Sequence, residues 1–193
     1  MESPTSHNDF AVHIMPKIIG IFLLVLFAGT AATLLGGCAA SNVSAADMQK
    51  RQQALAASDL LIVPGERIGP VRLGMGMDEV LSKLGRPDIV VDDEAISIWR
   101  YWSLSLTVSF DDIAAPVVRD INTMYWSDVP SHSVFKTAEG IGIGSSSFDV
   151  NRTYGSPDSG GPQNVMNYFS RGMQFGINDY AVSGIQISQS TRN

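Results

Sequence analysis

Cys38 is the residue whose type and position most directly suggest chemistry. It is the only cysteine in the 193-residue chain, and it follows two glycines at the end of an uncharged apolar stretch over residues 18–35. A lone cysteine forms no internal disulfide, and the small residues around this one offer little to bury its thiol. The pattern therefore favours chemical modification of Cys38 over a structural role. It also predicts a fold that depends on packing alone.

The residues before Cys38 are typical of a secretion signal. Lys17 precedes the run IIGIFLLVLFAGTAATLL, and a positive flank, an apolar run and a small-residue exit together describe a signal peptide. The sequence Leu35-Gly36-Gly37-Cys38 resembles the lipobox of bacterial lipoproteins, whose cysteine is lipidated and becomes the first residue after cleavage. The resemblance implies a signal peptide over 1–37 and a membrane anchor at Cys38.

Two alternatives stay open for this region. An apolar run of 18 residues is also just long enough for a permanent transmembrane helix. The acidic residues Glu2 and Asp9 are atypical of a signal peptide, and a translation start at Met15 is therefore the second alternative. Ala39 follows the cysteine where lipoproteins held at the inner membrane commonly carry aspartate. We therefore expect a cell-envelope protein, anchored in the outer membrane and facing the periplasm.

Catalytic, metal and cofactor chemistry has little support after Cys38. His132 is the only histidine there, it lies in a loop-like sequence, and no Gly-x-Ser-x-Gly motif accompanies it. The acidic clusters at 92–94 and 111–112 lack the spacing of a calcium loop. The glycine-rich segment 140–144 lacks the spacing and the lysine of phosphate-binding loops. A net charge of -6 without a basic cluster argues against nucleic acid. We expect a protein that is not an enzyme and has no metal, cofactor or nucleic-acid partner.

An internal repeat organises the rest of the chain. Residues 73–88, LGMGMDEVLSKLGRPD, align without gaps on residues 143–158, IGSSSFDVNRTYGSPD, at an offset of 70. Each copy predicts a two-turn helix that begins after Gly76 or Ser146, carries an acid in its first turn and ends at a glycine and a proline. Helices this short must dock on another element. Residues 47–57 are good helix formers with few apolar anchors, and predict a solvated or marginal helix.

Strand-like sequence follows each predicted helix. Residues 103–110, SLSLTVSF, alternate between hydroxyl and apolar side chains, which is typical of a half-buried antiparallel strand with a polar open face. We expect partner strands over 95–102 and 117–126. In the second copy, Met173, Phe175 and Ile177 occupy the corresponding positions, and 182–188 forms the last strand.

These elements predict an α+β fold. It has two tandem units, each with one helix on the apolar side of a three-stranded antiparallel sheet. The first unit covers 66–130 and the second 131–193. Residues 38–65 before them hold the lipidated cysteine, a tether and the marginal helix.

The repeated segment resembles a known group of proteins. It is similar to the helical opening of the SmpA/OmlA superfamily, which includes the BamE-like lipoproteins of the β-barrel assembly machinery. It is also similar to the tandem repeats of β-lactamase inhibitor proteins. The resemblance covers about residues 66–190. It implies the tandem α+β arrangement, and either a role in outer-membrane assembly or maintenance or the inhibition of a secreted enzyme.

Three aromatic residues are candidates for partner binding. Trp99 and Tyr101 have the same parity on one expected strand, and Tyr125 lies on another. On the polar open face these rings would be typical binding anchors, whereas on the other face they would be core residues. We expect a lipid-anchored, non-catalytic protein-interaction module with a protein partner in the envelope. The alternatives are an inhibitor of a secreted enzyme and a sensor domain for a small ligand.

Overall fold

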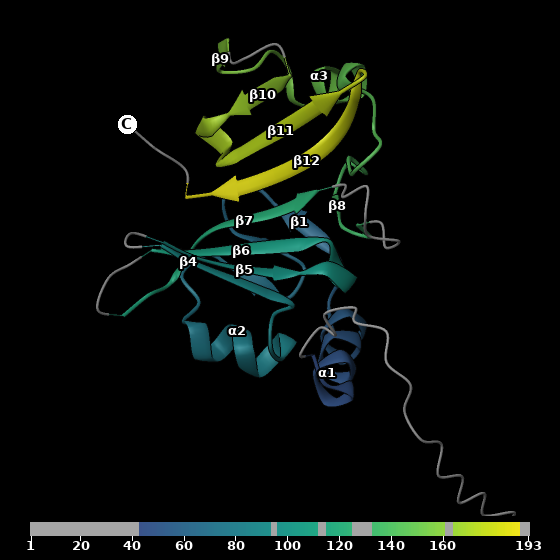
Figure 1. The fold of residues 1–193 in the computed structure, drawn as a ribbon. Helices are drawn as coiled ribbons and strands as arrows, with labels where there is room; N and C mark the ends of the chain where they lie inside the picture. The colour runs from purple at the N-terminus through teal and green to yellow at the C-terminus, as the bar shows by residue number, and fades with distance from the viewer. Residues whose placement is uncertain (1–42, 94–95, 112–114, 125–132, 161–163, 190–193) are drawn as a thin grey trace, which may run out of the picture. The chain divides into compact units, whose positions relative to one another are not determined.

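The computed structural model describes residues 43–93, 96–111, 115–124, 133–160 and 164–189. All of them belong to the unit that runs from residue 39 to residue 193. The fold is α+β, as predicted (Figure 1). Cys38, Tyr125 and His132 lie outside the described residues.

One antiparallel sheet of eight strands dominates the described unit, in the order β4-β5-β6-β7-β12-β11-β10-β9. The strands are β4 (Ile89–Asp93), β5 (Ile96–Tyr101), β6 (Leu106–Asp111), β7 (Val118–Met124), β9 (Ser159–Gly160), β10 (Val165–Tyr168), β11 (Met173–Asn178) and β12 (Ala181–Ser188). β7 and β12 lie side by side in the middle of the sheet (Figure 1). The prediction of two separate three-stranded sheets is therefore wrong. β4 and β9 each add an outer strand, and the two repeats share one sheet.

The two helices of the repeat are confirmed. α2 (Met77–Leu84) precedes β4, and α3 (Ser147–Tyr154) precedes β9. We call α2 with β4 to β7 the first half and α3 with β9 to β12 the second half. The Ser146 hydroxyl accepts a hydrogen bond from the Asp149 amide at 3.1 Å, while Gly76 begins α2 without a side-chain cap.

A turn of 3-10 helix changes one predicted strand. We expected a continuous strand over 103–110, but Trp102–Leu104 form the 3-10 turn and Ser105 has a left-handed φ of 49°. The strand β6 therefore begins at Leu106. Ser105 turns the chain so that Tyr101 pairs with Leu106 across the hairpin.

A second, smaller sheet covers part of the apolar face of the large one. Its strands are β1 (Leu61–Val63), β2 (Arg67–Ile68), β3 (Val71–Arg72) and β8 (Lys136–Thr137), in the order β3-β2-β1-β8. β2 and β3 contact β7. Ile62, Ile68 and Phe135 from this small sheet and its flank are at most 1% exposed. They share one core with Val80 of α2 and Val150 of α3, so both helices and the small sheet lie against the same face.

The N-terminal helix α1 (Ala45–Ala56) is docked rather than solvated. It packs against α2, and its Arg51 is only 1% exposed. The prediction of a solvated or marginal helix over 47–57 is wrong, because the buried Arg51 anchors the helix while Ala54 and Leu55 pack against the core. Among the described residues, no helix combines the length and apolar character needed to span a bilayer.

Candidate functional site

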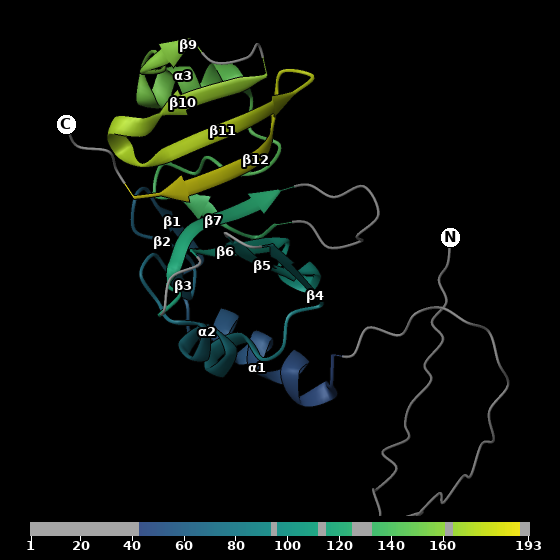
Figure 2. The same cartoon turned by 60° about the vertical axis from the view of Figure 1, so that its left-hand side comes forward.

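The face of the eight-stranded sheet that points away from the core is called the open face. On it, a row of polar side chains crosses five strands. Thr107 lies opposite Asn122, Asn122 opposite Gln186, Gln186 opposite Gln174, and Gln174 opposite Asn167. Four adjacent positions of this row are therefore amides, and we call them the amide row. Figure 2 shows the strands β6, β7, β12, β11 and β10 that carry it.

The amide row borders a hollow of about 260 Å³ at the centre of the open face. It is lined by Asn122, Met124, Gln174, Gly176, Ser183, Gly184 and Gln186. Gly176 of β11 and Gly184 of β12 lie directly opposite each other, so two cross-strand positions carry no side chain. A glycine inside a strand weakens it, and it often marks a close approach by a ligand or another backbone.

Backbone strain explains neither glycine. The φ of both lies outside the left-handed region. A Cβ on Gly184 would meet its nearest neighbour, Met124 Cβ, at 3.6 Å, and one on Gly176 would meet Ser183 Oγ at 3.5 Å. Both are ordinary van der Waals distances. A bulge between Gly176 and Ile177 leaves Ser183 out of the β11–β12 pairing, and from Gly184 to Ser188 the ladder with β7 holds its register. The fold therefore tolerates a side chain at Gly184, and glycine there keeps the hollow open.

The amide row also carries unused hydrogen-bond acceptors. The side-chain oxygens of Asn122 and Asn167 are buried and accept no hydrogen bond from the described residues. An unpaired buried acceptor costs about 1–3 kcal/mol, so it is usually paired with another group. Because both oxygens are buried, a donor on a partner reaches them only after the amide side chain turns outward.

Because glycine at 184 is not required for folding, we expect Gly184→Thr to leave the free energy of unfolding unchanged or to raise it by up to about 1 kcal/mol. Urea unfolding measures this. The adjacent Ile185 is fully buried on the other face, and Ile185→Ala should cost about 2–5 kcal/mol. A loss above about 1 kcal/mol for Gly184→Thr would show that glycine serves the fold.

The predicted aromatic anchors do not form a surface cluster. Tyr101 is fully buried, and its hydroxyl donates to the Gly85 carbonyl at 3.2 Å. Trp99 is half-buried and packs edge-on against Phe110, with 4.8 Å between ring centroids. The prediction of an exposed binding face is therefore wrong for both residues, since pairing with β6 directs them toward the core. Sequence reasoning overlooked the hollow, although an isolated glycine within a strand pattern such as VSGIQ signals it.

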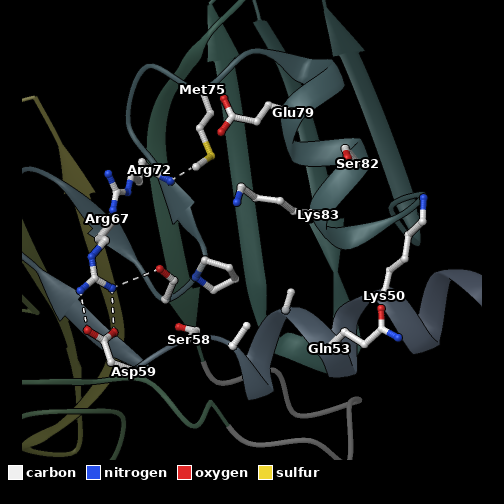
Figure 3. A pocket seen from close by; sticks show the side chains of 14 residues that line it. Lys50, Gln53, Ser58, Asp59, Arg67, Arg72, Met75, Glu79, Ser82 and Lys83 are labelled. Carbon is white, nitrogen blue, oxygen red and sulfur yellow. Dashed lines mark hydrogen bonds and ion pairs between the residues drawn. The ribbon is translucent and has the colours of Figure 1, made fainter.

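A second concave site lies between α1, β3 and α2, with a volume of about 590 Å³ (Figure 3). Four cationic side chains line it, against the two acids Asp59 and Glu79. Arg67 pairs with Asp59 at 2.6 Å, and this hydrogen bond lowers the pKa of Asp59 to about 2. Within the described part of the chain, Lys50, Arg72 and Lys83 have no ion-pair partner. The pocket therefore has unpaired positive charge.

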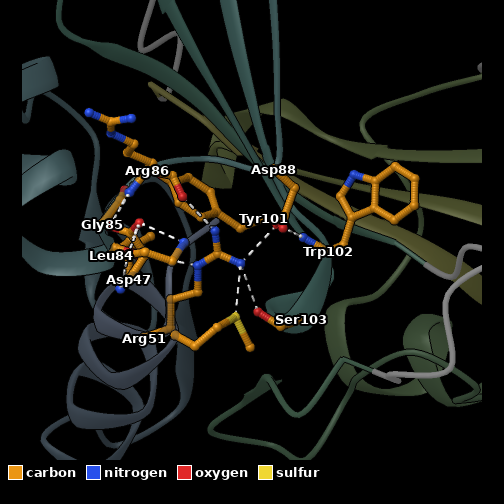
Figure 4. Close-up of polar contacts among 11 residues, drawn as sticks. Asp47, Arg51, Leu84, Gly85, Arg86, Asp88, Tyr101, Trp102 and Ser103 are labelled. Carbon is orange, nitrogen blue, oxygen red and sulfur yellow. Dashed lines mark hydrogen bonds and ion pairs between the residues drawn. The ribbon is translucent and has the colours of Figure 1, made fainter. Parts of the chain in front are cut away.

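The helix α1 forms one wall of this pocket. The buried guanidinium of Arg51 holds this helix in place (Figure 4). It donates to Asp88 Oδ2 at 2.8 Å, to Ser103 Oγ at 3.0 Å and to the carbonyl of Leu84 at 3.3 Å. It also donates to the carbonyl of Arg86 and lies 5.0 Å from the ring centroid of Tyr101. Arg51 thus binds the C-terminal end of α2 and the turn after it. A cation is favourable there because it faces the negative end of the helix dipole.

Asp47 completes the attachment of α1. One carboxylate oxygen accepts from the Ser44 hydroxyl at 2.7 Å and the Ser44 amide at 3.1 Å, and the other accepts from the Arg86 amide at 3.0 Å. The hydrogen bond from the Ser44 side chain, followed by those from the Arg86 and Ser44 amides, lowers the pKa of Asp47 from 3.8 to about 2. Asp47 therefore stabilises the fold only while it is ionised.

This carboxylate predicts an acid sensitivity of α1. Since the pKa of Asp47 is lower in the folded state, its contribution is fully present above about pH 4 and is lost as the pH falls toward 2. We expect Asp47→Asn to be less stable than the parent at pH 6, and the difference to shrink between pH 4 and pH 2. Thermal melts followed by circular dichroism at several pH values measure it. A difference independent of pH would contradict this role.

Comparison with known proteins gives little further information. No protein-family model matches the sequence, and no curated protein sequence matches it. One solved structure is a distant match, a 1.5 Å crystal structure of an extracellular protein containing an SCP domain from Bacillus anthracis str. Ames. The TM-score is 0.34 at 14% identity, and the match covers 61% of this chain and 44% of that one. This chain therefore matches less than half the length of that protein, and a likeness this distant supports no conclusion about function. No group of three or more metal-ligating side chains occurs among the described residues.

Proposed function

We propose that this chain is a lipid-anchored lipoprotein of the bacterial envelope that acts as a non-catalytic protein-interaction module. The open face of the eight-stranded sheet is its binding surface. The observation that carries the proposal is the hollow at Gly184, bordered by the amide row. There the fold tolerates a side chain but has none, and the buried side-chain oxygen of Asn122 accepts no hydrogen bond from the described residues. A polar surface of this kind suits a protein partner that inserts a side chain and donates hydrogen bonds.

Photo-crosslinking in the native envelope tests the proposal. A photoreactive residue at Gln186 lies on the open face, and a matched one at the exposed Arg152 lies on α3, which packs on the opposite face. We expect an adduct with one protein from Gln186 and none with that protein from Arg152. A barrel-assembly component in the adduct would support a role in outer-membrane assembly or maintenance, whereas a soluble secreted hydrolase would support an inhibitor. Equal adducts from both positions, or none from Gln186, would contradict the proposal.

The anchor is a separate part of the proposal. We infer that Cys38 carries the lipid and that the chain faces the periplasm from the outer membrane, on the strength of the lipobox-like sequence before it. Two or more acyl chains would attach the chain stably, because each buried methylene contributes about 0.8 kcal/mol. Mass spectrometry of the membrane fraction should find an N-terminal, lipid-modified Cys38. An uncleaved chain with a free thiol would contradict the anchor but not the binding face.

We further propose that the two halves are tandem units that resemble those of the SmpA/OmlA superfamily and of the β-lactamase inhibitor proteins. Each half has one short helix followed by four antiparallel strands, and the halves meet at β7 and β12. This order supports a duplicated unit. It also supports one continuous binding face formed by both halves, rather than two separate ones.

The basic pocket favours a second candidate function, a sensor domain for a small anionic ligand. Lys50, Arg72 and Lys83 line a concavity of about 590 Å³ and have no ion-pair partner among the described residues. Calorimetry with succinate, a small dicarboxylate, tests this function. Saturable binding that Lys83→Gln weakens, and that Lys136→Gln on β8 leaves unchanged, would support it. Absence of saturable binding at millimolar succinate would count against it.

A further inference from the structure

We propose that the second half carries a docking surface for a partner helix that presents an arginine. The surface is formed by Gly155, Asp158 and the turn at Phe169–Arg171, and it is the counterpart of the surface that α1 covers in the first half. It lies on the helix side of the sheet, so it is a different surface from the open face. The inference does not rest on the function proposed for that face.

The polar framework that receives Arg51 in the first half is repeated in the second. The Tyr168 hydroxyl donates to the Gly155 carbonyl at 2.8 Å, as the Tyr101 hydroxyl does to the Gly85 carbonyl at 3.2 Å. The Asp158 amide donates to a carbonyl of β10 at 2.8 Å, as the Asp88 amide does to one of β5 at 2.8 Å.

The carboxylates of the two halves are also held alike. Asp158 Oδ2 accepts from the Ser170 amide at 2.7 Å, and Asp88 Oδ2 accepts from the Trp102 amide at 2.8 Å. Both amides belong to the 3-10 turn after the neighbouring strand. The same carboxylate, helix end and turn are therefore present twice.

The two halves differ in what covers this framework. In the first half, Gly85 is buried, and a Cβ placed on it would lie 2.8 Å from the Asp47 Cα of α1. In the second half, Gly155 is exposed, and a Cβ there would meet no atom within 4 Å. Asp158 is likewise exposed, whereas Asp88 is half-buried. Within the described part of the chain, no helix occupies the position over α3 that α1 occupies over α2.

The chemistry of the uncovered surface matches that of α1. Asp158 and the C-terminal end of α3 supply negative charge, and Phe169, 44% exposed, supplies an apolar contact beside them. Arg171 lies 5.6 Å from the ring centroid of Tyr154, and its charge contributes to the lowered pKa of Asp158, but among the described residues it forms no ion pair with that carboxylate. Arginine suits this surface better than lysine because its planar guanidinium group can donate to a carboxylate and two carbonyls at once.

A partner protein is the occupant that the structure favours. The chain's own α1 is held in the first half by a buried Arg51, so it is not free to supply the arginine. The pattern to be recognised is that of α1 itself, an aspartate followed by an arginine one turn later, as in Asp47 and Arg51.

A peptide of residues 44–58, labelled with a fluorophore, is the probe, and the full chain in detergent is the receptor. We expect saturable binding by fluorescence anisotropy. Asp158→Asn should weaken it by about tenfold to a hundredfold, the effect of a hydrogen bond to a charged group of about 1.5–3 kcal/mol. A peptide with Arg51→Ala should bind as weakly. Asp179→Asn, at the exposed turn between β11 and β12, is the matched control and should change nothing.

Three results would overturn the inference. Binding that Asp158→Asn leaves intact would mean that the peptide displaces α1 from the first half or binds elsewhere. Absence of saturable binding would mean that the surface accepts no such helix. Self-association of the chain that Asp158→Asn abolishes would identify the occupant as a second copy and not a separate partner. Circular dichroism melts of the Asp158→Asn chain confirm that any loss of binding is not a loss of fold.

Discussion

Replacing Arg51 with alanine is expected to destabilise the protein by about 3 kcal/mol, the usual cost of removing one partner from a buried ion pair. The guanidinium is 1% exposed and its acceptors come from α2, the following turn and the 3-10 turn. Without it, Asp88 and the carbonyl at the end of α2 lose their buried donor, and α1 loses its anchor. Urea unfolding followed by circular dichroism measures the loss.

The neighbouring Lys50 provides the control for this prediction. It lies on the same helix, carries the same charge and is exposed. Lys50→Ala should change the free energy of unfolding by less than about 0.5 kcal/mol, as surface substitutions usually do. If Arg51→Ala were equally mild, α1 would not be held by its arginine.

The second large effect is expected at Gly85, and Gly155 provides a matched comparison. Both glycines end a helix with nearly the same backbone, φ 70° and ψ -165° for Gly85, and φ 81° and ψ -163° for Gly155. Residues with side chains strongly disfavour this region, so Ala at either position stores about 1–3 kcal/mol of strain. Only at Gly85 does the added Cβ also collide with a neighbour, at 2.5 Å from Asp47 Oδ1.

Gly85→Ala should therefore displace α1 as well as strain the backbone. We expect it to cost at least about 2 kcal/mol more than Gly155→Ala, since the hydrogen bonds of Asp47 and the packing of Arg51 are lost together. Unfolding in urea of the two variants side by side gives the difference. Equal costs would contradict the asymmetry between the halves on which the proposed helix-docking surface depends.

Local sequence signals predicted the helices well. Ser146 caps α3, and Gly85 and Gly155 end the two helices at the predicted positions. These features involve residues a few positions apart, so they can be inferred from spacing. Both glycines combine a positive φ with an extended ψ, a backbone conformation that is essentially restricted to glycine.

Long-range pairing could not be inferred in the same way. The alternation of apolar and polar residues in β7 and in β12 does not indicate that these two strands pair with each other. The left-handed φ of Ser105 sets the register of β5 against β6, and this register places Trp99 and Tyr101 toward the core. The docking of α1 could not be predicted from the sequence for another reason. Its anchor is a charged residue, which hydrophobic periodicity does not detect.

The candidate site was only partly accessible from the sequence. The strict alternation before Phe110 predicted a polar open face, and Thr107 and Ser109 do lie on it. The hollow depends on Gly176 and Gly184 being opposite each other, and that pairing follows from the β11–β12 register. Cys38 remains a prediction of the sequence alone.

Filling the hollow is the most direct test of the open face as a binding surface. A photoreactive residue at Thr107 reports on the partner from β6, and Gly184→Trp fills the hollow from β12. We predict that Gly184→Trp abolishes the Thr107 adduct in the native envelope while the chain stays folded, and that Asn151→Trp on the exposed side of α3 leaves the adduct unchanged. An undiminished Thr107 adduct in the Gly184→Trp chain would contradict partner binding at this face.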